Sequence, residues 1–372
     1  MWPKVIALSL GLSLAASGQA PAAAELARKA LAAREAGRLT ESIELYRKAL
    51  ALRPVDPESW WYQGLNYYDL DRYVEAEEAF RNVVAQNPEH GGGLALLGLC
   101  EFQNRKYKTA FAHIVLAKEK GIPPGSELER VAHYHYVMLA NKLGQFELAS
   151  GLLADLTRRA PETPRLAEMA GLSALRMPLL PDEIAPGDRE KVLLAGQAAV
   201  LAWRKDLPEA LRHADRLLEL YPRQPNAHYL KAYILLMMNS DRALEEFHKE
   251  LEISPRHVQA RLQIAYELRQ RGEAQKGLPY ALEAVKLAPE DLTARNICGR
   301  LLLDLDRVQQ AIVHLERAVK LAPTSPEAHF HLAAAYGRAG RAAEAARHRK
   351  LFLQHEEARK RRLGETLPSA QR

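Results

Sequence analysis

The sequence lacks the short motifs that accompany catalysis. It contains no glycine-rich phosphate-binding loop, no nucleophile elbow and no cysteine–histidine arrangement that a fold of this kind would bring together. Two His-x-His pairs are present, His133 with His135 and His329 with His331. Residues two positions apart on a helix point to different faces, so neither pair predicts a metal chelate. We therefore predict no catalytic residues, no metal site, no cofactor and no enzymatic activity.

Long apolar runs are also scarce. The stretch from Val5 to Ala16 is apolar or small, but it is shorter than the roughly 20 residues of a membrane-spanning helix. One cation, Lys4, precedes it and small residues follow it in Ser17–Ala24, which is the order of a secretory signal peptide. We predict a signal peptide over residues 1–22, no integral membrane segment after its removal, and a periplasmic or secreted location.

Neither positive nor negative charge dominates the sequence, since the formal net charge is only +6 over 372 residues. Basic residues become denser toward the C-terminus, and residues 360–372 form a basic tail. This tail is interpreted either as a contact for anionic lipid or polymer, or as a solvated helix end whose cations complement the helix dipole. The mild charge and the predicted export argue against nucleic acid as a partner.

Proline, by contrast, recurs at regular intervals. Eight prolines lie about one helical hairpin apart, at Pro54, Pro88, Pro123, Pro161, Pro222, Pro255, Pro289 and Pro323. Three of the seven intervals are 34 residues and one is 33. A fixed period in this range predicts an array of stacked structural units.

The segment 57–90 shows the pattern within one unit. Trp60, Gly64 and Tyr67 share one face of a predicted first helix, and Ala76 and Phe80 share a face of a second helix. Two helices of this length cannot bury their apolar faces alone, so they need neighbouring units on both sides. Gly64 and Ala76 are small where the two helices are expected to cross, because a larger side chain would separate them.

The same small residues recur along the chain. The first helices have Ala30, Gly64, Gly98, Ala198, Ala232, Ala265, Gly299 and Ala333 at the equivalent place. The second helices have Ser42, Ala76, Ala110, Ala149, Ala210, Ala243, Gly277, Ala311 and Ala345. This pattern resembles the tetratricopeptide repeat (TPR) family, and the resemblance implies an all-α fold, a right-handed superhelical solenoid of stacked helix-turn-helix hairpins.

Nine units follow from this register: 23–56, 57–90, 91–124, 130–163, 191–224, 225–257, 258–291, 292–325 and 326–359. They predict an N-terminal array of four repeats over 23–163 and a C-terminal array of five repeats over 191–359. Residues 164–190 break the register, with one helix followed by a proline-rich stretch. This segment is interpreted either as an extra helix with a surface loop or as a joint between the two arrays.

The two cysteines, Cys100 and Cys298, fall on first helices of units that are not neighbours. Because each repeat contacts only its neighbours, we predict that no disulfide joins them and that both are small buried apolar residues.

The TPR resemblance implies that the first helices line a concave groove that binds a partner. In the N-terminal array the groove residues are predicted to be Trp61, Leu65, Tyr68, Leu99, Phe102, Tyr134 and Met138. In the C-terminal array they are predicted to be Tyr229, Tyr233, Tyr266, Arg269, Asn296 and Arg300. The first set suits an apolar helix or an extended peptide, and the two arginines of the second set suit a carboxylate.

The sequence thus predicts an exported, non-enzymatic scaffold that binds a protein or peptide partner in its groove. Two alternatives stay open. One is a structural subunit of a cell-envelope assembly, as in polysaccharide export or pilus biogenesis, with contacts on the second helices or at the ends. The other is binding of a glycan or another anionic ligand by the C-terminal set.

Overall fold

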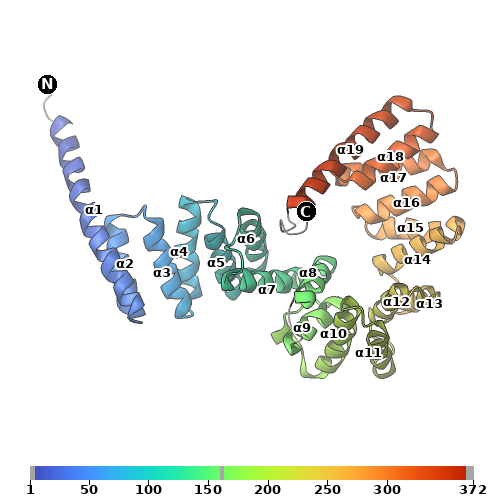
Figure 1. Ribbon diagram of the computed structural model, residues 1–372, viewed down its shortest axis with the longest axis horizontal. Helices are drawn as coiled ribbons and strands as arrows, with labels where there is room; N and C mark the ends of the chain where they lie inside the picture. The colour runs from blue at the N-terminus through green and yellow to red at the C-terminus, as the bar shows by residue number, and fades with distance from the viewer. Residues whose placement is uncertain (1–4, 160–162, 366–372) are drawn as a thin grey trace. The chain divides into compact units, whose positions relative to one another are not determined.

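The computed structural model describes residues 5–159 and 163–365 of the chain (Figure 1). Within these ranges the chain forms nineteen α-helices, two short 3-10 helices and no strand, which confirms the predicted all-α array of helical hairpins. Residues 1–4 of the predicted signal peptide, Pro161 and residues 366–372 of the basic tail lie outside the described ranges. The chain divides into an N-terminal unit, Met1–Arg189, and a C-terminal unit, Glu190–Arg372.

The N-terminal unit contains four hairpins and one single helix, and successive helices contact one another along the chain. Its helices are α1 (Val5–Glu35), α2 (Leu39–Leu52), α3 (Pro57–Asp69), α4 (Tyr73–Gln86), α5 (Gly91–Gln103), α6 (Tyr107–Lys120), α7 (Glu127–Lys142), α8 (Phe146–Arg159) and α9 (Pro164–Ala174), followed by the 3-10 helices η1 (Pro181–Glu183) and η2 (Pro186–Asp188).

The C-terminal unit contains five hairpins, and each first helix alternates with a second helix. Its helices are α10 (Arg189–Trp203), α11 (Leu207–Leu220), α12 (Ala227–Met237), α13 (Ala243–Ile253), α14 (Val258–Gln270), α15 (Ala274–Leu287), α16 (Leu292–Asp304), α17 (Val308–Leu321), α18 (Pro326–Arg338) and α19 (Ala342–Glu365). The first helices also contact each other, α14 with α16 and α16 with α18.

The two helices of a hairpin approach closely at their small residues. A Cβ atom added at Gly98 of α5 would lie 2.7 Å from Cγ1 of Ile114 and 3.1 Å from the carbonyl oxygen of Ala110, both on α6. A Cβ atom at Gly299 of α16 would lie 2.5 Å from Cγ of Leu315 on α17. These distances are shorter than van der Waals contact, so a side chain at either position requires Ile114 or Leu315 to move.

The segment after α9 is tied to the N-terminal unit by polar contacts. The side-chain amide of Asn141, at the end of α7, donates to the carbonyl oxygens of Met177 at 2.9 Å and Leu179 at 3.0 Å. Lys142 forms an ion pair with Glu183 of η1 at 2.6 Å. Asn141 is buried, and its amide supplies donors to these two backbone carbonyls in place of a second helix.

Cys100 on α5 and Cys298 on α16 are both free and buried, as predicted. Burial raises the pKa of each thiol to about 12, so both remain protonated at neutral pH.

We predict opposite effects from the same substitution at two helical glycines. Gly98→Ala lowers the free energy of unfolding by about 1 kcal/mol, because overpacking outweighs the gain in helix propensity. Gly151 on α8 is exposed, and a Cβ atom there would have no neighbour within 4 Å. Gly151→Ala therefore stabilises the protein by about 0.5–1 kcal/mol. Urea unfolding of both variants tests the prediction, and a stabilising Gly98→Ala contradicts the close approach.

Candidate functional site

Most aromatic residues predicted to line the N-terminal groove pack against their neighbours. The ring of Trp61 on α3 lies 5.7 Å from Phe80 and 5.0 Å from the ring of His90. Phe102 on α5 lies 4.7 Å from the ring of His135 on α7. These rings are half-buried and fill the space between hairpins.

The other members of the N-terminal set differ in exposure. Leu65 and Tyr68 on α3 are also partly buried against the core, and burial raises the pKa of Tyr68. Tyr134 on α7 is half-buried. Leu99 and Met138 are only 2% and 5% exposed. The prediction that these last two line a groove is therefore wrong, because both face the neighbouring helices and present no surface to a ligand.

In the C-terminal unit the predicted tyrosines lie on α12 and α14. Tyr229 stacks on the ring of His257 at 4.7 Å and is partly buried. Tyr233 is 43% exposed, which leaves much of its ring open to a partner. The hydroxyl of Tyr266 accepts a hydrogen bond from the side chain of Gln270 at 2.8 Å.

The remaining predicted residues lie on the adjacent first helices α14 and α16. A side chain caps the N-terminus of each first helix in this part of the unit. His257 accepts from the backbone N–H of Ala260 before α14, and Asp291 accepts from that of Ala294 before α16. Ser325 does the same before α18. These caps fix where each helix begins and hence which side chains share a face.

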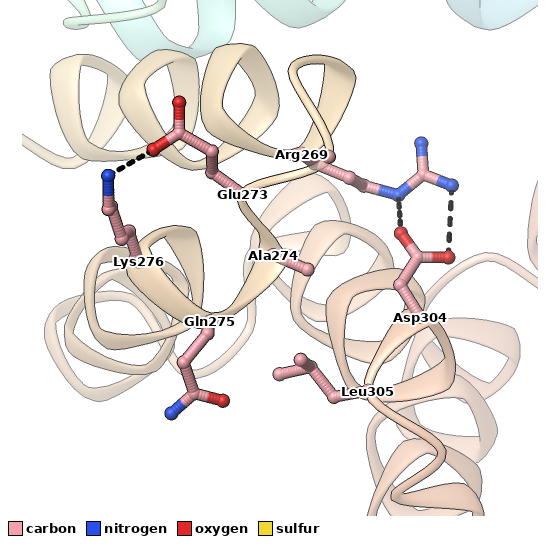
Figure 2. Close-up of a pocket in the computed structure, with 8 residues that line it drawn as sticks. Arg269, Glu273, Ala274, Gln275, Lys276, Asp304 and Leu305 are labelled. Atoms are coloured by element: carbon pink, nitrogen blue, oxygen red, sulfur yellow. Dashed lines mark hydrogen bonds and ion pairs between the residues drawn. The ribbon is translucent and has the colours of Figure 1, made fainter.

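Arg269 on α14 reaches across to Asp304 at the end of α16 (Figure 2). Its Nε lies 2.6 Å from Oδ2 of Asp304, and its Nη2 donates to Oδ1 in a long hydrogen bond of 3.4 Å. The Nε contact is an ion pair rather than an aligned hydrogen bond, since the Nε–H has no acceptor in line with it. Arg269 is thus held by a carboxylate but only partly satisfied by it.

An open hollow of about 640 Å³ lies beside this ion pair, between the α14–α15 turn and the end of α16. Figure 2 shows Arg269 and Asp304 at one side of it and a second ion pair, Lys276 with Glu273, at the other. Each of these charges lies beside an opposite charge, so the hollow itself has little unpaired charge to recognise a ligand.

Arg300 on α16 differs from Arg269 because no described residue forms an ion pair or hydrogen bond with it. Its Nε is shielded from solvent and has no hydrogen-bond partner, and the same holds for Oδ1 of Asn296, one turn earlier on α16. Burial, and then the nearby charge of Arg269, lower the pKa of Arg300. We call Arg269, Asn296, Arg300 and His331 together the Arg300 site.

His331 on α18 completes the site from the next hairpin. Burial, and then the charges of Arg300 and Arg269, lower its pKa to about 4, so its ring is neutral at pH 7. A neutral ring adds a donor and an acceptor without adding a third positive charge. The other histidine of this pair, His329, is buried and contacts His348 and the carbonyl oxygen of Pro323.

The sequence did not predict Asp304, His331 or Phe330 as parts of this surface. Phe330 on α18 is 52% exposed and follows Asn296 by one 34-residue period. That period is a signal that could have identified it. Asp304 follows Arg269 by 35 residues, which is the separation at which Arg34 forms an ion pair with Asp69 in the N-terminal unit.

Two further properties concern the described residues as a whole. They contain no group of three or more His, Cys, Asp or Glu side chains placed to hold a metal ion. None of the described helices combines the length and the apolar character needed to cross a membrane.

The geometry is that of a helical-repeat scaffold, with hairpins stacked in register and unsatisfied polar groups on adjacent first helices. Residues 299–340 match the family described as TPR repeat, and residues 28–81 and 63–121 match that described as tetratricopeptide repeat. The chain contains tetratricopeptide repeats over these matched residues.

Individual relatives are distant. The DnaJ homolog subfamily C member 7 homolog of Schizosaccharomyces pombe is 24% identical over 234 residues, which are 60% of this chain and 45% of that protein. The chain therefore spans about half the length of that relative. MamA from Desulfovibrio magneticus is 23% identical, with a TM-score of 0.43 over 45% of this chain and 96% of its own. YrrB, described as a TPR protein with an unusual peptide-binding site, is 19% identical, with a TM-score of 0.41 over 46% of this chain and 89% of its own.

We predict that Arg300→Met raises the melting temperature. The substitution keeps the length of the side chain and removes both the repulsion from Arg269 and the unpartnered Nε. Solvent screens part of this repulsion, so the expected rise is about 2 °C. The matched control is Lys320→Met on α17, which removes one exposed charge from the second helix of the same hairpin and leaves the melting temperature unchanged. A lower melting temperature for Arg300→Met contradicts an unsatisfied site.

Proposed function

We propose that this chain is a non-enzymatic, exported scaffold that holds a peptide or helix of another protein against its first helices. TPR proteins bind protein or peptide partners and are generally not catalytic. Within this family property, we assign the binding surface to the first helices of the C-terminal unit, Glu190–Arg372.

The proposal rests on first helices of the C-terminal unit that carry exposed aromatic rings and polar atoms without hydrogen-bond partners. Tyr233 on α12 and Phe330 on α18 are the exposed aromatic residues of these helices, at 43% and 52%. Asn296 and Arg300 lie between them in chain order, on α16, with polar atoms that have no partner. Exposed rings and unpaired polar atoms both cost free energy, and a bound peptide offsets both at once.

Two observations support export: the order of residues in the N-terminal sequence, and the position of the first buried side chain among those described. The apolar stretch and the small residues that follow it have the order of a signal peptide. The first buried side chain among those described is Ala23, directly after the proposed leader of residues 1–22. Removal of that leader therefore leaves every described buried contact of α1 in place.

A second candidate function is a structural subunit of a cell-envelope assembly. It is favoured by exposed aliphatic residues on second helices, where a groove-bound peptide does not reach. Val313 on α17 is 63% exposed and Leu282 on α15 is 43% exposed. Contacts of an assembly through the second helices would cover both.

The two candidates predict different cross-links. A photoreactive benzoylphenylalanine replaces Tyr233 or Phe330 on the first helices, or Leu282 or Val313 on the second helices, in the native cell. All four positions are exposed, so each tolerates the substitution. We expect partner adducts from the first-helix positions only, detected by mass spectrometry. Adducts from the second-helix positions alone contradict groove binding and favour the assembly subunit.

Export has its own test. Fusion of residues 1–24 to an alkaline phosphatase that is active only outside the cytoplasm gives an active reporter in a bacterial host. Replacement of Leu8 and Leu10 by arginine interrupts the apolar stretch and abolishes that activity. A reporter that stays inactive with the unaltered segment contradicts export.

A further inference from the structure

One exposed position of the second helices reverses the sign of its charge within the C-terminal unit. It lies nine residues after the small residue at the crossing point and one residue before the end of its helix. In chain order this position holds Glu219 on α11, Glu252 on α13, Lys286 on α15 and Lys320 on α17, all of them exposed. Equivalent positions of stacked hairpins share one face, so this face has two negative charges followed by two positive charges.

Local helix stability accounts for the two lysines but not for the two glutamates. The C-terminal end of a helix has a partial negative charge, which stabilises a cation there and destabilises an anion. Lys286 and Lys320 therefore suit the last turns of α15 and α17, whereas Glu219 and Glu252 destabilise the last turns of α11 and α13. An ion pair with Arg216 at 3.1 Å offsets the charge of Glu219, but Glu252 forms no ion pair with a described residue.

The four charges complement those of a second copy of the same surface. A two-fold axis parallel to the second helices, between α13 and α15, reverses the order of the helices and keeps each position at its height along them. Glu252 of one copy then lies opposite Lys286 of the other, and Glu219 lies opposite Lys320. The symmetry forms each of these contacts twice, as in any isologous interface.

The lysines are available for such contacts. Lys320 forms no ion pair with a described residue, and Lys286 has only a long contact of 3.4 Å with Glu283 on the same helix. Exposed ion pairs contribute little free energy individually, so this contact is readily exchanged for another carboxylate. Apolar area is available beside the lysines, because Leu282 on α15 is 43% exposed and Val313 on α17 is 63% exposed.

We propose that the second-helix face of α11, α13, α15 and α17 binds a second copy of this chain in a two-fold symmetric dimer. The glutamates of each copy contact the lysines of the other, and Leu282 and Val313 are covered by α13 and α11 of the other copy. Contact through the second helices leaves the first helices of both copies uncovered.

Sedimentation of the full chain and of two charge-reversed variants tests this dimer. We expect the full chain to sediment with twice the mass of one copy, 41.7 kDa. Glu219→Lys with Glu252→Lys makes all four positions basic, and Lys286→Glu with Lys320→Glu makes all four acidic. Each variant replaces every attraction by a repulsion and raises the dissociation constant of its dimer about 50-fold.

An equimolar mixture of the two variants restores all four opposite-charge contacts. We expect this mixture to form a heterodimer with the affinity of the unaltered chain, although each variant alone is monomeric at the same concentration. The matched control reverses two exposed lysines on second helices of the N-terminal unit, Lys48→Glu with Lys108→Glu, and leaves the dimer unchanged. Circular dichroism verifies that all three variants keep the helical content of the unaltered chain.

Benzoylphenylalanine at Leu282 provides a second measurement. Leu282 lies one turn before Lys286, so we expect a cross-link between two copies of the chain. Its mass, twice that of one copy, distinguishes it from an adduct with a different protein.

Four results overturn the inference. A full chain that is monomeric up to about 100 µM refutes the dimer. A dimer that both charge-reversed variants retain refutes this surface, and a mixture of the variants that stays monomeric refutes the pairing of glutamates with lysines. A monomeric chain that binds phosphatidylglycerol vesicles, and loses this binding on Lys286→Glu with Lys320→Glu, identifies a lipid surface instead.

Discussion

The close approach of the two helices in each hairpin is the constraint on which the rest of the structure depends. At Gly98 and Gly299 the facing helix leaves no room for a Cβ atom. A hairpin closed this tightly presents two apolar faces that it cannot bury itself, so neighbouring hairpins must stack on it. The spacing of small residues along the chain follows from this requirement, because every hairpin needs the same crossing point.

Stacking then determines which first-helix residues remain for binding. Trp61 and Asn296 occupy the same position of their predicted repeats, but they serve different purposes. Trp61 packs its ring against Phe80 of the same hairpin and against His90, which precedes the next hairpin. Asn296 is too small to fill such a space and leaves its carbonyl oxygen without a partner. At this repeat position α3 thus carries a large ring used for packing, whereas α16 carries a polar side chain that packing does not satisfy.

Leaving the polar atoms of Asn296 and Arg300 without partners destabilises the folded protein. Arg300 lies near the like charge of Arg269, and burial disfavours its charged form. Asp304 neutralises Arg269 but leaves Arg300 unpaired. Natural cores pair most buried polar atoms, so the unsatisfied atoms of Asn296 and Arg300 on adjacent turns distinguish this surface from the packed core.

The sequence by itself determined the all-α hairpin array, the crossing residues such as Gly98 and Gly299, and the burial of Cys100. These features depend on periodic patterns within one or two helices, and helix periodicity is a local property of the chain. Only the tertiary structure decided that Leu99 and Met138 are buried, that Asn141 anchors the proline-rich segment, and that Arg269 is held by Asp304. Each of these depends on a side chain from another helix, brought close by stacking, and no spacing along a single helix specifies which neighbour will be there.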